Sequence, residues 1–296
     1  MPLLLVGIPI AVILAIVIYP TVWMFYHAFQ NTNMMSLFSG NWQNVGFSNF
    51  AYVLASERFQ DSVGNLAFYL TFGATLQVIL GAALALIIYE LIRPRWLQTV
   101  VLILLVLPMM MPPSIAGTLW KFLLQANNGA FNHLLINLGL MAPDVRIDWF
   151  SVDLSLVSLV IADTWQWTAL PLLIVYSGRV SLPPAIYEAA RVDGASGWQV
   201  LTRLTLPMLR EIIAIAFILR FMDAYKFVDK VYVMTSGGPA QSSELPVYIA
   251  FQKGIREFQI GEAAAYAILI FIFAAMLITL FLQYLKRVMR HQGVTS

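Results

Sequence analysis

The sequence predicts an all-α membrane protein with six transmembrane helices. Of its 296 residues, 60% are hydrophobic and only 11% are charged, whereas a soluble domain carries about 25% charged residues. Six apolar runs reach the roughly 20 residues that a helix needs to cross the hydrocarbon core, where each backbone amide must be bonded within its own helix. A mostly polar, charged segment at residues 188–207, between two of these runs, is the third informative feature.

The expected spans follow one another along a chain that we expect to form a single transmembrane domain, residues 1–296. They lie at about residues 2–28, 64–92, 99–125, 154–178, 206–227 and 263–285. The first run has no basic residue before its apolar part and no small-x-small cleavage pattern before Tyr26 and His27. We therefore expect a retained span rather than a signal peptide.

Lysine and arginine in the short loops set the expected orientation, because these residues accumulate on the cytoplasmic side. Placing both termini inside puts nine basic residues in the cytoplasm: Arg93, Arg95, Arg179, Arg191, Arg203, Arg210, Lys286, Arg287 and Arg290. The other side then holds seven: Arg58, Lys121, Arg146, Lys226, Lys230, Lys253 and Arg256. This small excess favours cytoplasmic termini.

The polar segment at residues 183–205 is predicted to fold as two short helices joined by a glycine turn. Pro183 and Pro184 suit the first turn of a helix, where a missing N–H has no consequence, and Gly194 suits its left-handed C-terminal cap. Ser196 stands three residues before Gln199, which is the spacing of a capping box. The second helix then runs toward the next span.

The first of these helices carries a narrow face of small residues, formed by Ala185, Ala189 and Val192. It is too short and too polar to span, and it lacks the lysine-rich face of a lipid-surface helix. A helix with such a face can lie in a groove of another protein. A plain amphipathic connector is the alternative that the helix by itself leaves open.

The stretch "EAARVDGASGWQVLTRLTLP", from Glu188 to Pro207, resembles the EAA signature of permease subunits of binding-protein-dependent ABC importers. The spacing from Glu188 to Gly194 and on to Leu206 matches throughout, with Leu204 where the family often has isoleucine. The resemblance implies a type I ABC importer permease fold, in which this segment is the cytoplasmic coupling segment. The residues that it assigns to ATPase coupling are Glu188, Ala189, Ala190, Asp193, Gly194, Leu206 and Pro207.

The similarity extends to the carbohydrate-uptake, maltose-type branch of these permeases. It is carried by "LPMMMPPSIAGTLWKFL", "NGAFNHLLINLGL", "DTWQWTALPLLI", "FVDKVYVMTSGGP" and "GEAAAYAIL". It implies a sugar importer in the cytoplasmic membrane of a prokaryote, with a second permease subunit as heterodimer partner and two ATP-binding subunits that hold ATP and Mg. It also implies an external solute-binding protein that docks on the outer loops near Gly237, Gly238 and Pro239.

The residues agree with a non-catalytic translocation subunit. No glycine is followed by lysine, so the phosphate-binding loop of an ATPase is absent from the sequence. His27, His133 and His291 are far apart, and we expect no metal site. The alternative function is an ion-coupled secondary transporter, because such proteins place ionisable residues within spans, as Asp163, Arg220 and Asp223 are here.

A solute pathway is predicted near the middle of the fourth span. Trp165 lies roughly 16 Å along that span at about 1.5 Å per residue, and the hydrocarbon core is about 30 Å thick. Asp163, Trp165, Gln166 and Trp167 are unfavourable at this depth unless they line a wet cavity, and together they offer rings and polar groups to a sugar. The resemblance adds Asn65, Tyr69 and Lys121. For each residue, a polar group that only packs helices remains the alternative.

Overall fold

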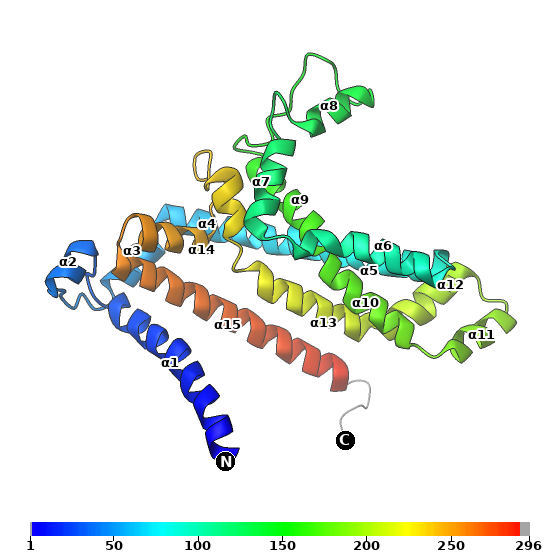
Figure 1. The fold of residues 1–296 in the computed structure, drawn as a ribbon, viewed down its shortest axis with the longest axis horizontal. Helices are drawn as coiled ribbons and strands as arrows, with labels where there is room; N and C mark the ends of the chain where they lie inside the picture. The colour runs from blue at the N-terminus through cyan, green and yellow to red at the C-terminus, as the bar shows by residue number, and fades with distance from the viewer. Residues whose placement is uncertain (1, 291–296) are drawn as a thin grey trace. The chain divides into compact units, whose positions relative to one another are not determined.

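The protein consists of helices joined by loops over the part that its computed structural model describes, Pro2–Arg290 (Figure 1). Within that range an isolated bridge between Gln30 and Asn44 is the one strand-like pairing, which confirms the predicted all-α class. The chain divides into two compact units. Unit 1 comprises Met1–Gly64 and Glu244–Leu277, and unit 2 comprises Asn65–Ser243 and Ile278–Ser296.

Unit 1 gathers helices from both ends of the sequence around two small apolar clusters. Val53, Ile249 and Tyr266 are buried in one cluster, and Ala28 and Ile268 in the other. Its helices are α1 (Pro2–Ala28), α2 (Met34–Ser39), α3 (Ser48–Ala55), α14 (Pro246–Phe251) and the π-helical turn η4 (Gln252–Arg256), with part of α4 (Glu57–Phe68) and of α15 (Ile260–Arg290).

Ion pairs tie these segments of unit 1 together. The Arg58 guanidinium donates to both carboxylate oxygens of Glu244 at 2.6 Å, and the Lys253 ammonium lies 3.0 Å from Glu257 and 2.9 Å from Glu262. Burial alone would lower the pKa of Lys253, but hydrogen bonds to the two glutamates raise that pKa above its ordinary value. Lys253 is therefore charged at neutral pH and holds η4 to α15.

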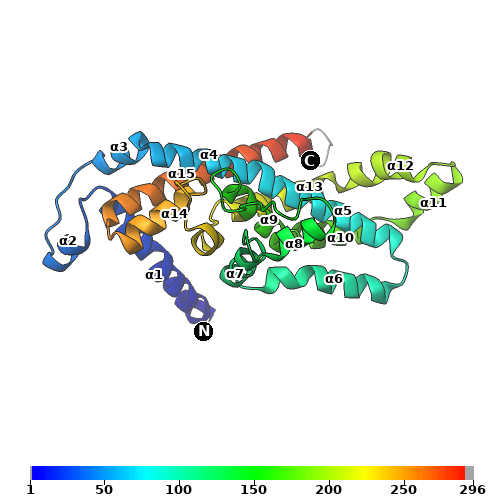
Figure 2. The same cartoon turned by 90° about the horizontal axis from the view of Figure 1, so that it is seen from above.

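Unit 2 packs α5, α10 and α13 side by side (Figures 1 and 2). Ala85, Val175 and Leu209, one from each helix, meet in its core. The helices of unit 2 are η1 (Tyr69–Ala74), α5 (Thr75–Leu91), α6 (Arg95–Met110), α7 (Pro113–Leu123), α8 (Ala130–Asn137), α9 (Ser155–Trp167), α10 (Ala169–Ser181), α11 (Pro184–Val192), α12 (Gly197–Val200), η2 (Leu201–Thr205), α13 (Leu206–Ala224) and η3 (Val231–Thr235).

Two glycines set how closely these three helices approach. A Cβ at Gly81 would lie 2.8 Å from the backbone nitrogen of Leu172, and one at Gly178 would lie 2.5 Å from the Ile212 side chain. Small residues permit such backbone contact between helices. α10 is therefore held against α5 at Gly81 and against α13 at Gly178.

Three helices of the described chain are long and apolar enough to cross a membrane: Glu57–Leu91, Ser155–Ser181 and Ile260–Phe281. They contain most of the predicted spans at 64–92, 154–178 and 263–285. The helix α13, expected as a span at 206–227, carries Arg210, Glu211, Arg220 and Asp223. In the first predicted span, the apolar helix Val12–Ala28 is shorter than these three helices. The total of six spans stays a prediction.

The predicted continuous span at 99–125 is wrong in one respect, because the helix is broken. α6 and α7 form a pair bent by 97° around Met111 and Pro112, and they make a fourth span only if the pair is counted as one. Pro112 and Pro113 lack backbone N–H donors, and a proline ring clashes with the preceding helical turn. The proline pair ends α6 and starts α7 in a new direction.

Candidate functional site

The coupling segment folds as the sequence predicts. α11 begins after Pro183, and Gly194 follows its end with a left-handed φ of 74°. Ser196 accepts from the backbone N–H of Gln199 while the Gln199 side chain accepts from the Ser196 N–H, so the capping box is present. From there the chain stays helical through α12 and η2 into α13.

The coupling segment stands at one end of unit 2 in both ribbon views (Figures 1 and 2). Ala185, Glu188, Ala189 and Val192 are exposed, and Val192 keeps 88% of its surface. The opposite side of α11 is buried and contains Tyr187 and Ala190, as is typical of an amphipathic helix. The small-residue face is therefore open, and Ala190 is turned away from it.

The remaining members of the motif lie around this helix. Asp193 and Gly194 are exposed at its end, and a Cβ at Gly194 would meet no atom within 4 Å. Leu206 is 37% exposed, and Pro207 lies in the first turn of α13. The motif thus surrounds one exposed helix and the start of the span that follows it.

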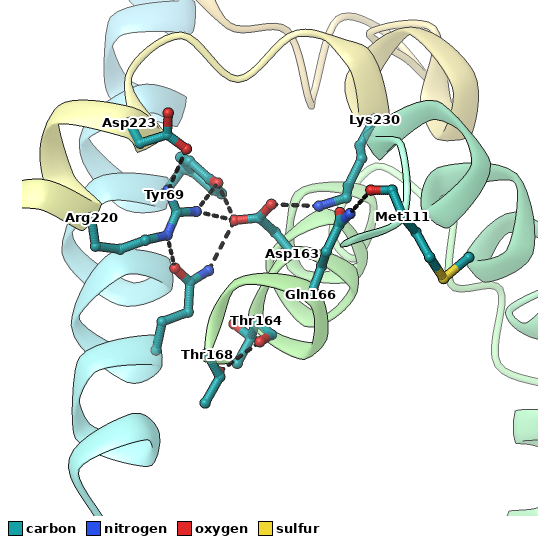
Figure 3. Close-up of polar contacts among 10 residues, drawn as sticks. Tyr69, Met111, Asp163, Thr164, Gln166, Thr168, Arg220, Asp223 and Lys230 are labelled. Carbon is teal, nitrogen blue, oxygen red and sulfur yellow. Dashed lines mark hydrogen bonds and ion pairs between the residues drawn. The ribbon is translucent and has the colours of Figure 1, made fainter. Parts of the chain in front are cut away.

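A second polar region is buried in unit 2 and centred on Asp163 of α9 (Figure 3). The Lys230 ammonium donates to one carboxylate oxygen at 2.6 Å, and Gln77 donates to the other at 2.9 Å. The Arg220 guanidinium and the Tyr69 hydroxyl also donate to that second oxygen. We call these five residues, Tyr69, Gln77, Asp163, Arg220 and Lys230, the Asp163 cluster.

The other contacts of Arg220 complete the cluster. Its guanidinium donates to the Gln77 amide oxygen and, at 3.1 Å, to the Tyr69 hydroxyl. Asp223, one turn along α13, lies 3.5 Å away, so Arg220 contacts both carboxylates and not only its i+3 neighbour as the sequence indicated. Asp163 is thus the buried counter-charge of Arg220 and Lys230, and the partly exposed Asp223 is a second carboxylate that Arg220 shares with Lys226.

Aromatic rings cover the Asp163 cluster. The Phe227 ring stacks on Tyr69 with centroids 4.7 Å apart, and the Trp167 ring lies 5.4 Å from the Arg220 guanidinium carbon. Asp163 has no exposed surface, whereas the sequence predicts that it lines a wet cavity. In this structure two cations and two neutral donors take the place of water around the carboxylate.

Gln166 and Trp165 do not join the cluster. The Gln166 amide donates at 2.7 Å to the backbone carbonyl of Met111, which lies at the break between α6 and α7 (Figure 3). Residues two apart on a helix face different sides, and Trp165 lines a separate, mainly apolar cleft of about 300 Å³ with Pro108. Gln166 therefore hydrogen-bonds to the backbone at the break between α6 and α7, and Trp165 faces away from Asp163.

The remaining pathway candidates, Asn65 and Lys121, lie on α4 and α7, outside the five residues of the Asp163 cluster. Asn65 lies on α4, four residues before Tyr69. The Lys121 ammonium on α7 donates at 3.0 Å to the backbone carbonyl of Val233. Of the seven predicted pathway residues, Tyr69, Asp163 and Trp167 are the ones that meet around Arg220.

The loop after η3 is an ordered turn. Gly237 has a φ of 83° and is buried, while Pro239 is exposed. The Ser243 hydroxyl donates to the Gly238 carbonyl at 3.1 Å, which fixes the loop on unit 2. Of the three residues predicted to dock a binding protein, Pro239 offers the most surface.

Sequence reasoning missed Gln77 and Lys230 as site residues and did not pair Arg220 with Asp163. A lone glutamine inside an apolar run was the available signal for Gln77, because a buried amide requires partners. Lys230 gave no such signal, since the sequence places it in an outer loop. Its contact with Asp163 depends on how η3 packs against α7 and α9.

No group of three or more His, Cys, Asp or Glu side chains could hold a metal ion within the described range. His27 bonds the Thr32 hydroxyl at 2.8 Å. His291 lies outside the described residues, as do the side chains of Lys286, Arg287 and Arg290 that entered the orientation count.

Long apolar helices, a buried cluster of paired charges and an exposed helix, α11, are the features that the comparison with known proteins has to explain. The chain belongs to the family of binding-protein-dependent transport system inner membrane components, whose model matches residues 77–291. This membership favours the importer over the ion-coupled secondary transporter.

Individual relatives agree with the family. The chain is 32% identical over 222 residues to a trehalose/maltose transport system permease protein of Thermococcus litoralis, covering 74% of this chain and 72% of that protein. It is 29% identical to a diacetylchitobiose uptake system permease protein of Streptomyces coelicolor, covering 90% and 79%. A crystal structure of a bacterial ABC transporter involved in the import of the acidic polysaccharide alginate has the same fold, with a TM-score of 0.80 at 20% identity over 99% of this chain and 95% of that one.

Proposed function

We propose that this chain is the translocation subunit of an ABC importer that accepts a sugar or sugar-like solute from an external binding protein and passes it into the cytoplasm. The observation that carries the proposal is the exposed helix α11, which ends at a left-handed Gly194 and leads through the capped start of α12 and through η2 into α13. A rigid helix with an open small-residue face is suited to a groove of a partner protein. The partners are two ATP-binding subunits.

The energy comes from those partners, which hold ATP and Mg, and this chain carries out no catalysis. To move a permease from about 1:99 to 99:1 between two access states requires a bias of about 5.5 kcal/mol. ATP-driven closure of the subunits supplies it by displacing α11, and the capping box between Ser196 and Gln199 transmits the movement toward α13. The residues in coupling are Glu188, Ala189, Ala190, Asp193, Gly194, Leu206 and Pro207.

The solute is a sugar or a related polar molecule. Relatives named for trehalose/maltose and for diacetylchitobiose support this class, because sugars stack on aromatic rings and need hydrogen-bonding groups. The pathway passes the aromatic and polar side chains of α4, η1, α7 and α9: Asn65, Tyr69, Lys121, Asp163, Trp165, Gln166 and Trp167. In the state that admits solute, Trp167 and Tyr69 face water.

The assembly has further members. A second permease subunit completes the pathway as a heterodimer partner, and the binding protein docks beside Gly237, Gly238 and Pro239. The second permease subunit and the binding protein both contact this chain, which forms one transmembrane domain in the cytoplasmic membrane of a prokaryote. The binding protein and the ATP-binding subunits both shift the equilibrium between the two access states of the permease. Docking of the binding protein outside therefore stimulates ATP hydrolysis inside.

Reconstitution of the full complex tests this function. Solute uptake should require ATP and binding protein together and should not respond to a proton or sodium gradient. The matched control is this chain alone in gradient-loaded vesicles, which should show no uptake. Uptake in that control would establish the ion-coupled mechanism instead.

Access along the pathway can be tested in the cysteine-free chain. The variant Trp167→Cys should react with a water-soluble thiol reagent in the ATP-bound or the ATP-free complex. Val175→Cys, at a core position with no exposed surface, is the control and should stay protected in both. Protection of residue 167 in both states would remove it from the pathway.

A further inference from the structure

A cavity of about 900 Å³ lies where the ends of α5, α6 and α10 meet α11. Its charged lining is mostly basic, with four arginines and two glutamates: Arg93, Arg95, Arg179, Arg191, Glu90 and Glu188. All of these residues belong to unit 2, and both ribbon views place the link from α5 to α6 near the same end as α11 (Figures 1 and 2). The cavity therefore carries an excess of positive charge.

One arginine of the cavity is committed to the fold. The Arg179 guanidinium donates to Glu90 at 2.6 and 2.9 Å and lies between the rings of Tyr89 and Tyr187, 4.1 and 4.0 Å from their centroids. Its side chain keeps 5% of its surface. This stack joins α10 to α5 and α11, and it uses the charge of Glu90.

The other three arginines are available to a ligand. Arg93, Arg95 and Arg191 are exposed, and no ion pair involves them among the residues that the structure describes. Guanidinium groups bind phosphate through paired hydrogen bonds. The cavity thus has the chemistry of a phosphate site.

The surroundings of the cavity favour phosphate that belongs to a lipid. Leu91 and Trp96 flank Arg93 and Arg95 and are 73% and 70% exposed. Tryptophan concentrates at the membrane interface, and basic pockets between spans on the cytoplasmic side hold anionic headgroups. Apolar helices α5 and α6 extend from this point, so acyl chains can follow them while a headgroup occupies the cavity.

We propose that this cavity binds the phosphate headgroup of an anionic phospholipid from the cytoplasmic leaflet, with Arg93 and Arg95 as its main contacts. The assignment to that leaflet depends on the orientation proposed above. Arg191 and Tyr187 of α11 line the same cavity, so a bound headgroup links the coupling helix to the α5–α6 connection. The lipid therefore regulates how firmly α11 is positioned for the ATP-binding subunits.

Lipid binding to the full chain tests the proposal without nucleotide, binding protein or transport. Native mass spectrometry would measure the affinity for phosphatidylglycerol, with phosphatidylcholine as the neutral reference lipid. A basic residue near the headgroups contributes roughly a fivefold factor in affinity, so Arg93→Gln with Arg95→Gln should weaken phosphatidylglycerol binding about 30-fold. Binding of phosphatidylcholine should not change.

Matched variants separate the cavity from general surface charge. Arg210→Gln removes an exposed arginine of α13 that does not line the cavity, and it should leave the preference for phosphatidylglycerol in place. Arg93→Lys with Arg95→Lys keeps the charge and should retain part of the affinity. Thermal unfolding in phosphatidylcholine shows that each variant is folded before its lipid affinity is compared.

Three results would overturn the proposal. The first is an unchanged phosphatidylglycerol affinity in the folded double glutamine variant. The second is displacement of the lipid by millimolar inorganic phosphate, which would make free phosphate the ligand. The third is loss of lipid when the ATP-binding subunits assemble, which would assign the cavity to the subunit interface. Since none of these depends on uptake, a failure here is distinct from a failure of the proposed transport function.

Discussion

The Asp163 cluster and the coupling segment are both polar interruptions of an apolar chain, and they satisfy their polar groups in opposite ways. In the cluster, Asp163, Arg220 and Lys230 are at most 1% exposed and bond to one another. In α11, Glu188 and Ala189 face outward, while Tyr187 and Ala190 on the other side of the helix are buried. The difference separates a region that holds the chain together from one whose surface stays exposed.

This difference has an energetic origin. A buried charge without a counter-charge is strongly unfavourable, so a cluster within apolar helices has to be complete. A helix exposed to water has its polar groups solvated, and its terminal amides and carbonyls need only caps. Substitutions in the cluster should therefore change the stability of the chain, whereas those on the exposed face of the coupling segment should change its assembly.

The largest effect is expected for Asp163→Asn. It leaves Arg220 and Lys230 buried without their shared carboxylate, and removal of one partner from a buried ion pair costs about 3–5 kcal/mol. The melting temperature in detergent should fall markedly. The double variant Asp163→Asn with Lys230→Met removes one of the uncompensated cations and should recover part of the loss. If the single variant melted like the parent chain, the cluster would not hold the fold.

The two alanines of the motif allow a buried and an exposed position to be compared within one helix, α11. Ala190 is 8% exposed, so Ala190→Leu should overpack its site and destabilise the chain by about 1–3 kcal/mol. Ala189 is exposed, so Ala189→Leu should leave the melting temperature unchanged while it weakens capture of the ATP-binding subunits. If both variants changed the melting temperature equally, α11 would not have one buried face and one exposed face.

Gly194→Val should have a smaller effect on stability and a clear effect on assembly. No atom lies within 4 Å of a Cβ at Gly194, but its φ of 74° disfavours side chains, and a left-handed conformation costs roughly 1–2 kcal/mol. We expect normal membrane insertion and reduced ATP-dependent uptake. Gly194→Asn is the control, because asparagine tolerates this conformation. Uptake at the normal rate in the valine variant would exclude a coupling role for this turn.

The smallest effect is expected for Asp223→Asn, at the rim of the cluster. The Asp223 side chain is 36% exposed and also lies 3.2 Å from Lys226, which is 60% exposed. Solvent screens such pairs, so the change in the free energy of unfolding should stay within about 1 kcal/mol. A loss as large as that of Asp163→Asn would extend the buried cluster to Asp223.

Local signals in the sequence were sufficient for the coupling segment and for the helical class. The caps at Ser196 and Gly194 depend on hydrogen bonds within a few residues and on one backbone angle, so the short-range pattern determines them. The apolar runs likewise determine that the chain is helical, because a helix satisfies its own backbone. The proline pair at Pro112 and Pro113 was the local signal for the broken helix. The direction that α7 takes after the break did not follow from this pair.

Only the tertiary structure decided what surrounds Asp163. Its bonds to Arg220, Lys230 and Tyr69 cross 57, 67 and 94 residues of sequence. Such contacts depend on the rotation of each helix about its axis and on the path of η3, which the pattern of apolar residues leaves open. The sequence by itself determined that polar groups within the spans must be satisfied. Their partners were set by the packing of α5, α9 and α13, since a buried charge is stable only where that packing brings its counter-charge.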